Sequence, residues 1–293
     1  MPMSITLEDA GLFQMVCYHD GLAHPPGYPL FALACSTLVI SPEVMNGNLV
    51  SALFGAFTIV VFFLLLLSVT RSRIIATSAA LAYAFSATFW AQSIIVEVYS
   101  LAALLLFLCW TTLDRFVQHK REVDWFLACL IFGLALSNHW PLILLSAPAL
   151  LAVVWPEVRP LLFKLTNSRF LLLTLLSFVL GLTPYFYLVT RPDEVFGVFG
   201  QINSFSEFVD YVSRSAYNDD KPGTGIADKL AFLSWLPLET IRQIGFPVSL
   251  LAAVGAYYSF KTAPRHQAIA FLLNYLGCTF LLTLALGFEF DRN

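Results

Sequence analysis

The stretch GNLVSALFGAFTIVVFFLLLLSV, residues 47–69, contains no charged side chain and few polar ones. About 20 mostly apolar residues in an α-helix are enough to cross the hydrocarbon core of a bilayer, so this stretch predicts a membrane-spanning helix. Seven further apolar runs, two of them short, are separated by charged or turn-forming residues. The eight predicted spans are residues 47–69, 74–92, 96–114, 125–138, 140–156, 169–189, 244–260 and 266–287. The chain is therefore predicted to be an all-α polytopic membrane protein.

The composition of the whole chain agrees with this prediction. Apolar residues make up 58% of the 293 residues and charged residues 12%, against about 25% charged residues in an average soluble domain. The mean hydropathy is +0.76. A net charge of −3 leaves no basic stripe of the kind that nucleic-acid binding requires, so no nucleic-acid partner is expected.

A ninth apolar run, residues 28–41, decides the topology. It is short and follows three prolines within five positions, which favours an interfacial or re-entrant helix over a span. Lys and Arg residues near helix ends concentrate on the cytoplasmic side. If the ninth run does not cross, ten of the sixteen Lys and Arg residues fall in short loops on one face. We therefore predict that this face is the cytoplasmic one.

The same topology places two long segments, residues 1–46 and 190–243, on the opposite, non-cytoplasmic face. Fifteen of the nineteen acids lie on that side, so we expect the functional site there. Only a few residues precede Glu8, and they show no signal-peptide pattern. We expect a single transmembrane domain over residues 1–293 that lacks a first helix and a C-terminal part.

Four polar residues near the outer ends of the spans are candidates for a site, because ionisable groups at membrane depth usually face a cavity or a partner. Glu97 is either an interfacial carboxylate or a contact at a cavity rim. Asn138 and His139 interrupt an apolar run at a predicted outer turn, either as hydrogen-bonded turn residues or as part of a site. Arg191 ends a span, either as an anchor for lipid headgroups or as a guanidinium fork for the phosphate of a specific ligand.

The second outer segment predicts two helices that lie on the membrane surface. Ser204 is placed as an N-cap with Glu207 three residues later, and apolar residues follow at helical spacing. Residues 227–240 form the second candidate helix. Between the two helices, Asp219 and Asp220 lie in a turn-rich stretch that is either a solvated turn or a cation site.

The opening segment contains two acids and two cysteines of interest. Glu8 and Asp9 are either capping acids for a following helix or carboxylates, one of which deprotonates an acceptor hydroxyl. Cys17 and Cys35 could pair in an oxidising compartment, but spacing alone does not show whether their α-carbons lie within bonding reach. The five cysteines show no metal-binding spacing, so we expect no structural metal, and a need for a divalent cation stays open.

Several motifs together resemble one membrane family. DAGLF at residues 9–13 and HPPGYPL at residues 24–30 are similar to the D-S-G-E-F and H-P-P-G-Y-P-L signature of a family that includes the protein O-mannosyltransferases of the transmembrane-protein-260 type. Further similar motifs are Phe89-Trp90 with Gln92, EVYSL at residues 97–101, Asn138-His139, Pro184-Tyr185 with Tyr187, Arg191, and FVDYVSRSAY at residues 208–217. The resemblance covers nearly the whole chain.

The resemblance implies a C-type glycosyltransferase fold, in which a polyprenyl-phosphate sugar enters from the bilayer and an acid of the first outer loop faces the acceptor. Asp9 matches that acid and is implied as the catalytic base. Leu12 stands where the family has a glutamate, which puts a mechanism with two carboxylates in doubt unless Glu8 substitutes. The residues implied to bind the acceptor or to line the cavity are His24, Tyr28, Glu97, Asn138, His139 and Arg191, with Arg191 the contact for the donor phosphate. Glu8 has no family counterpart and is a further candidate for catalysis or acceptor binding.

The sequence therefore predicts a membrane glycosyltransferase. It would move a hexose such as mannose from a polyprenyl phosphate to a protein, lipid or glycan acceptor outside the cytoplasm. The alternatives are a transporter or lipid flippase, and an assembly scaffold without chemistry. A transporter predicts paired broken helices in an inverted repeat near the midplane of the bilayer. The polar residues of this chain cluster toward the outer face instead.

Overall fold

The computed structural model describes residues 1–2, 4, 9–19, 21–41, 43–190, 201–215 and 225–285. Its helices are α1 (Ala10–His19), α2 (Pro29–Leu38), α3 (Val44–Thr70), α4 (Arg73–Ala84), α5 (Ala87–Ser93), α6 (Tyr99–His119), α7 (Glu122–Leu145), α8 (Ala147–Val154), η1 (Trp155–Glu157), α9 (Val158–Leu165), α10 (Ser168–Leu182), η2 (Thr183–Tyr185), α11 (Phe186–Val189), α12 (Phe205–Ser213), α13 (Ile226–Ile244), α14 (Phe246–Thr262) and α15 (Arg265–Ala285). The structure is 84% helical, and no strand occurs among the described residues. The all-α prediction is confirmed.

Five of the helical segments are long and apolar enough to cross a membrane, so the chain is a multi-pass membrane protein. They are Val44–Thr70, Tyr99–His119, Glu122–Leu145, Ser168–Val189 and Arg265–Leu284. The predicted span 74–92 forms α4 and α5, which are bent by 67° and make a sixth crossing if the pair counts as one broken span. At eight and seventeen residues, α8 and α14 are shorter than the roughly 20 residues that a crossing needs. Fewer single helices therefore qualify than the eight predicted.

The predicted break at residues 137–139 is present. The range α7 contains two helical segments that meet at His139, where the backbone is non-helical (φ −150°, ψ 82°). His139 caps the second segment, because its Nδ1 atom accepts from the Leu142 N–H (3.2 Å). Trp125, before the break, and Val154, after it, line the same cavity, so the two sides of the break pack against each other.

α6 is the central helix of the bundle. Of its span, 72% is buried, against 33% or less of the other four. The indole N–H of Trp110 in α6 donates to Gln267 of α15 (2.9 Å), and Gln267 donates to the Asp114 carboxylate of α6 (2.6 Å). Asp114 also accepts from Ser68 of α3 (2.9 Å). These bonds join three helices and satisfy a carboxylate that would be costly to bury alone.

α7 and α10 cross at a pair of glycines. A Cβ atom on Gly133 would lie 2.5 Å from the Phe178 carbonyl oxygen and 2.9 Å from Gly181 Cα. Small residues at such a crossing let two backbones approach closely, and in lipid this packing replaces the hydrophobic effect as the source of helix association. The two glycines therefore set the separation of α7 and α10.

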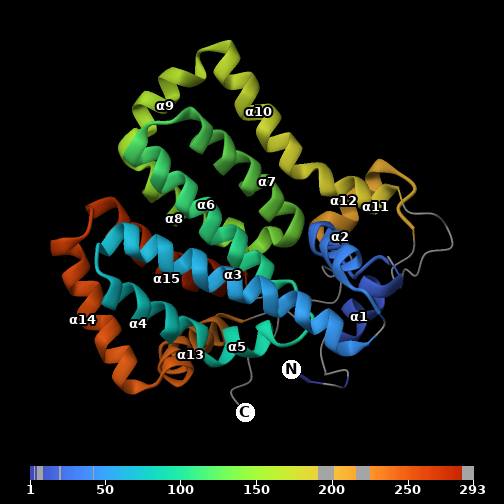
Figure 1. Cartoon of the computed structure of the whole chain (residues 1–293), viewed down its shortest axis with the longest axis horizontal. Helices are drawn as coiled ribbons and strands as arrows, with labels where there is room; N and C mark the ends of the chain where they lie inside the picture. The colour runs from blue at the N-terminus through green and yellow to red at the C-terminus, as the bar shows by residue number, and fades with distance from the viewer. Residues whose placement is uncertain are drawn as a thin grey trace.

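The two ends of the bundle differ in character. Figure 1 shows α1, α2, α11 and α12 gathered at one end, whereas the α3–α4, α6–α7, α9–α10 and α14–α15 turns lie toward the other. The second end carries the basic residues of the predicted cytoplasmic loops and pairs some of them with acids. Arg115 binds Asp124 (3.1 Å), and Lys164 binds Glu122 (2.9 Å).

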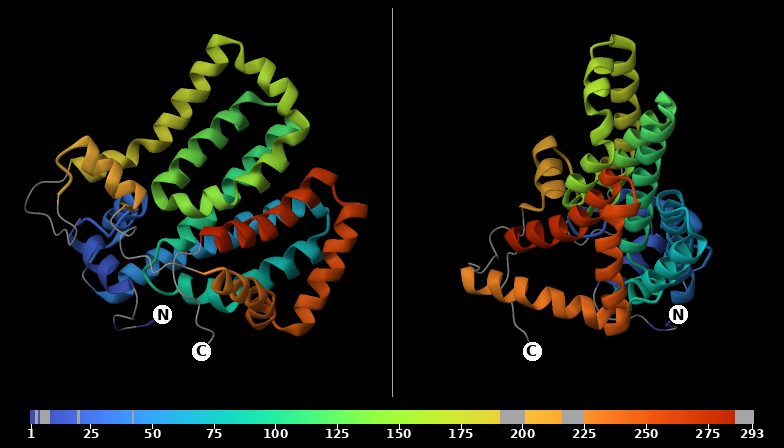
Figure 2. Two further views of the ribbon diagram at one scale, coloured as in Figure 1. Left: turned by 180° about the vertical axis from the view of Figure 1, so that it is seen from behind. Right: turned by 90° about the vertical axis from the view of Figure 1, so that its left-hand side faces the viewer.

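The short helices predicted outside the spans are present. The apolar run 28–41 forms α2, whose ten residues are too few to cross a bilayer. Ser204 caps α12, where its side-chain oxygen accepts from the Glu207 N–H (3.2 Å). The second predicted surface helix corresponds to α13, and Figure 2 shows it crossing the direction of the long helices.

Candidate active site

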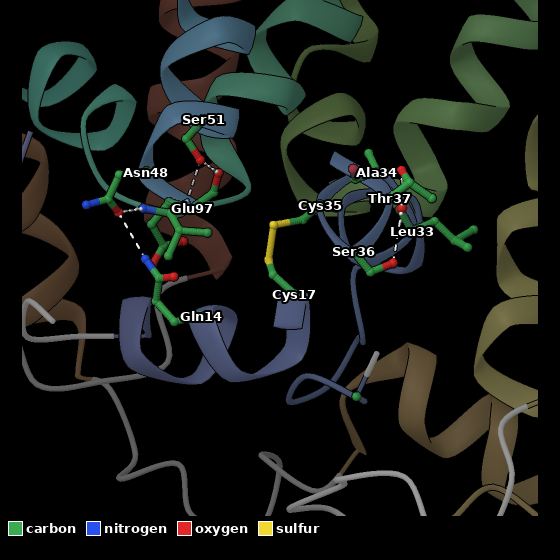
Figure 3. Close-up of a disulfide and its surroundings, with 12 residues drawn as sticks. Gln14, Cys17, Leu33, Ala34, Cys35, Ser36, Thr37, Asn48, Ser51 and Glu97 are labelled. Atoms are coloured by element: carbon green, nitrogen blue, oxygen red, sulfur yellow. Dashed lines mark hydrogen bonds between the residues drawn. A yellow bond between two sulfur atoms is a disulfide. The ribbon is translucent and has the colours of Figure 1, made fainter. Parts of the chain in front are cut away.

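A disulfide between Cys17 and Cys35 joins α1 to α2 (Figure 3). Their α-carbons lie 5.1 Å apart, so the pairing that spacing alone left open is present. Beside it, Phe13 of α1 packs edge-on against Phe31 of α2, with ring centroids 5.5 Å apart. The helix that follows Asp9 is thereby held against the helix that follows the HPPGYP turn.

Residues 24–29 form the tight turn that leads into α2. The Gly27 N–H donates to the His24 carbonyl oxygen (2.8 Å), and Gly27 has a φ of +90°, a conformation that favours glycine. A Cβ atom on Gly27 would lie 2.8 Å from Leu188 Cδ2 and 2.9 Å from a ring carbon of Tyr211. The turn therefore requires glycine both for its backbone conformation and for its packing against α11 and α12.

Two tyrosines from distant segments hold the chain just before this turn. The Tyr187 hydroxyl of α11 donates to the Gly21 carbonyl oxygen (3.0 Å). The Tyr211 hydroxyl of α12 donates to the Ala23 carbonyl oxygen. The position of the next residue, His24, is thus set by helices that lie far along the chain.

Asp9 and His24 meet in space. His24 Nε2 lies 3.0 Å from Asp9 Oδ2, and His24 Nδ1 lies 3.0 Å from the Pro25 carbonyl oxygen. Either ring nitrogen can donate, depending on the tautomer, and with the proton on Nε2 the imidazole donates to the Asp9 carboxylate. The Asp9 side chain is 54% exposed and that of His24 only 11%. A hydroxyl group can therefore reach the carboxylate while the imidazole supports it from inside.

A row of rings extends from this pair into the bundle. His24 contacts Tyr28 edge-on (centroids 5.2 Å apart), Tyr28 stacks on His139 (5.7 Å, 15° between planes), and His139 contacts Tyr99 (5.4 Å). His139 Nδ1 accepts from the Leu142 N–H (3.2 Å), so the neutral ring carries its proton on Nε2. His139 thus lies at the predicted break and contributes its ring to the site.

Glu97 and Asn138 are buried near this row, at 3% and 1% exposure. The Ser51 hydroxyl accepts from the Glu97 N–H (3.0 Å) and donates to its carbonyl (3.1 Å) (Figure 3). Asn138 donates to the Val98 carbonyl (3.2 Å), and its Oδ1 atom is buried without a hydrogen-bond partner among the described residues. Glu97 is therefore a buried residue, which argues against the exposed interfacial carboxylate, and its charge acts on the Tyr28 phenol.

Arg214 is a site residue that the sequence prediction did not single out. It follows α12 in a left-handed conformation (φ 62°), and its positive charge acts on both Tyr28 and His139. Burial raises the pKa of the Tyr28 phenol, and Arg214 opposes that rise. Tyr28 therefore remains a protonated hydrogen-bond donor at neutral pH. Arg214 is the only basic residue of FVDYVSRSAY, a motif that the resemblance had already identified.

Several predicted residues do not contribute to this geometry. Glu8, Arg191, Asp219 and Asp220 lie outside the described residues. Leu12 packs against the hydrophobic core, so α1 places no second carboxylate there. In the described part of the chain, no group of three His, Cys, Asp or Glu side chains is arranged to hold a metal ion.

Two cavities lie beside the row of rings. The larger, of about 1060 Å³, is bounded by α7, α10, α11 and α12 and is lined mostly by apolar side chains such as Trp140 and Phe186. It extends to Ser213, the neighbour of Arg214. The other, of about 750 Å³, lies between α5, α6, α13 and α15 and includes Tyr99 in its lining. The fold and site together define a polytopic membrane protein with a carboxylate–imidazole pair, an arginine and two cavities near one end of its bundle.

Comparison with known proteins identifies the family. The model of the protein O-mannosyl-transferase TMEM260 N-terminal domain matches residues 9–159. Protein O-mannosyl-transferase TMEM260 of Mus musculus is 31% identical over 298 residues, which cover 97% of this chain and 42% of the relative. The Dictyostelium discoideum protein of the same name is 24% identical over 238 residues. This match covers 73% of this chain and 28% of the relative. The chain belongs to the TMEM260 family of protein O-mannosyl-transferases.

The comparisons also define how far this assignment extends. The chain spans less than half the length of either of these relatives. The family model begins at Asp9 and includes His24 and His139, whereas Arg214 lies beyond the matched residues. No solved structure matches the chain.

Proposed function

We propose that this chain transfers a hexose, such as mannose, from a polyprenyl phosphate to a hydroxyl group of an acceptor, and that the acceptor is a protein serine or threonine. Both relatives described above are named protein O-mannosyl-transferases. The observation that carries the proposal is the Asp9–His24 pair. A half-exposed carboxylate backed by a buried imidazole is suited to take a proton from a hydroxyl group.

Asp9 acts as the base in this proposal. With its proton on Nε2, the His24 imidazole donates to Asp9 Oδ2 across 3.0 Å, which orients the carboxylate. Asp9 takes the proton of the acceptor hydroxyl while the hydroxyl oxygen attacks the anomeric carbon and the bond from that carbon to the phosphate oxygen breaks.

Positive charge stabilises the departing phosphate. Arg214 can offer its planar guanidinium fork to two phosphate oxygens, and Tyr28 is a further donor beside it. The apolar cavity of about 1060 Å³ extends to Ser213, next to Arg214, so the polyprenyl chain has an apolar path to the same point. Arg191, for which the sequence predicts this role, remains a second candidate.

We place the site on the non-cytoplasmic face. Disulfides form and persist in oxidising compartments, and the Cys17–Cys35 bond lies at the end of the bundle that carries the site. The turns that carry basic residues lie toward the opposite end, as the positive-inside rule requires. Both features support the same orientation.

The test is the Asp9→Asn variant, assayed in membranes with labelled polyprenyl-phosphate mannose and a serine- and threonine-containing acceptor. Losing a positioned base lowers the rate by about 10²- to 10⁴-fold, so transfer should fall by that factor. Glu43→Gln is the matched control, because it removes a carboxylate from an exposed residue just before α3. Full transfer by Asp9→Asn at normal expression would eliminate Asp9 as the base, and a lack of transfer by the wild type would favour a transporter or scaffold.

A further inference from the structure

The cavity of about 750 Å³ has a lining that the proposed proton transfer does not use. Its volume lies within the range of about 300–1,000 Å³ that is usual for small-molecule sites. Two contacts hold α13 across it. Gln243 accepts from the Thr88 N–H of α5 (2.7 Å), and the Thr240 hydroxyl hydrogen-bonds the Tyr275 hydroxyl of α15 (2.9 Å). The cavity is therefore enclosed by several helices that are held together by specific contacts.

Three polar atoms in this lining have no hydrogen-bond partner in the part of the chain that the structure describes. They are Gln92 Oε1, Ser100 Oγ and Asn274 Oδ1, and Ser100 is only 1% exposed. Buried polar atoms are hydrogen-bonded in the great majority of cases, and leaving one unsatisfied destabilises the structure. All three can accept, so they suit a ligand that donates several hydrogen bonds.

The rest of the lining combines aromatic rings with low charge. Phe89, Trp235 and Tyr275 supply flat apolar surfaces, and no Lys or Arg is among the described residues that line the cavity. The Glu239 carboxylate already accepts from Gln243 (2.6 Å). A phosphate is disfavoured here, because no cation neutralises it. A neutral sugar ring fits this lining. Its C–H faces can pack on the aromatic rings, and its hydroxyl groups can donate to the three oxygens described above.

The cavity adjoins the row of rings in the site. Tyr99 lines it and contacts His139, and Leu142 lines it and donates its N–H to the same imidazole. We propose that this cavity binds a neutral hexose unit. The proposal rests on the proposed function only for the source of that hexose, which is either the sugar of the lipid donor or a sugar already attached to the acceptor.

Protection of a thiol tests sugar binding without requiring turnover. Cys278 lines this cavity, whereas Cys129 lines a separate apolar cavity and serves as the internal control. The solubilised protein is labelled with N-ethylmaleimide in the presence of methyl α-mannoside, or of glycine betaine at equal osmolality, and both thiols are followed by peptide mass spectrometry. Mannoside should slow labelling of Cys278 alone. Equal labelling of Cys278 in mannoside and betaine would overturn the proposal.

Substitutions in the lining locate the binding. Gln92→Leu and Asn274→Leu nearly retain the size of the side chain but remove the amide. Each should raise the mannoside concentration that half-protects Cys278 by about 2- to 10-fold, which is the effect of losing one hydrogen bond. Gln201→Leu, at an exposed position, should change nothing. Unchanged protection in both cavity variants would overturn the assignment. In the Asp9→Asn variant, mannoside should still protect Cys278. A failure of the proposed catalysis and a failure of sugar binding are therefore distinguishable.

The transfer assay then separates the two sources of the hexose. A changed preference of Asn274→Leu between mannosyl- and glucosyl-phosphate lipids supports the donor sugar as the occupant. A changed KM for a glycosylated acceptor, with donor preference intact, supports a sugar on the acceptor.

Discussion

Replacing Cys17 by serine should destabilise the bundle measurably, because the disulfide closes a loop with a sequence separation of 18 residues. Loop-closure entropy assigns about 3 kcal/mol to a cross-link of this span. Cys17 and Cys35 are both buried, and their neighbours Phe13 and Val16 belong to the main hydrophobic core. α1 and α2 should therefore unfold together with the bundle. At about 2–4 °C per kcal/mol, Tm should fall by about 6–12 °C.

Thermal unfolding of the detergent-solubilised protein, followed by tryptophan fluorescence, measures this change. Cys35→Ser and the double variant should give the same Tm as Cys17→Ser, since one bond needs both sulfurs, and Cys278→Ser should leave Tm unchanged. Without reductant, the denatured wild type should expose three reactive thiols of its five cysteines. Five reactive thiols, or additive effects of the two single variants, would refute the reasoning.

Three further predictions concern the turn, the helix crossing and the phosphate contact. Gly27→Ala should lower the free energy of unfolding by about 2–5 kcal/mol. The left-handed conformation of the new alanine costs about 1–2 kcal/mol, and its overpacking costs about 1–3 kcal/mol. An unchanged Tm would contradict this. Gly181→Ala should lower Tm through overpacking of about 1–3 kcal/mol, whereas Gly255→Ala, with open space around it, should not. Transfer should decrease in the order wild type, Arg214→Lys, Arg214→Gln, because lysine keeps the charge but loses the fork; equal rates for all three would exclude Arg214 as a phosphate contact.

Much of the fold could be predicted because it depends on local patterns. The Ser204 cap was predictable because it involves residues three positions apart, and the length of the run 28–41 alone limited α2 to a short helix. The break at His139 was also predictable, because the polar Ser-Asn-His triplet interrupts an apolar run locally. The bend between α4 and α5 could not be predicted in the same way.

The candidate site was predicted in part. The motif resemblance brought Asp9, His24 and Tyr28 into one prediction, and the structure places Asp9 against His24 and Tyr28 beside His24. Arg214 was missed as an individual residue because its role depends on where α12 packs, and nothing in its local sequence distinguishes it from a solvent-exposed arginine. The cavity of about 750 Å³ was missed for the same reason, since helices from α4 to α15 contribute its lining.

The sequence by itself determined that this is an all-α membrane protein with its acids concentrated outside the predicted cytoplasmic loops. Apolar length and the placement of charge act over stretches of about 20 residues, which are visible in a single chain. Only the tertiary structure decided that Cys17 bonds Cys35, that His139 stacks on Tyr28, and that Arg214 acts on the same rings. These contacts join residues from helices that pack side by side although they are distant in the chain, and such packing depends on the shapes of whole helices.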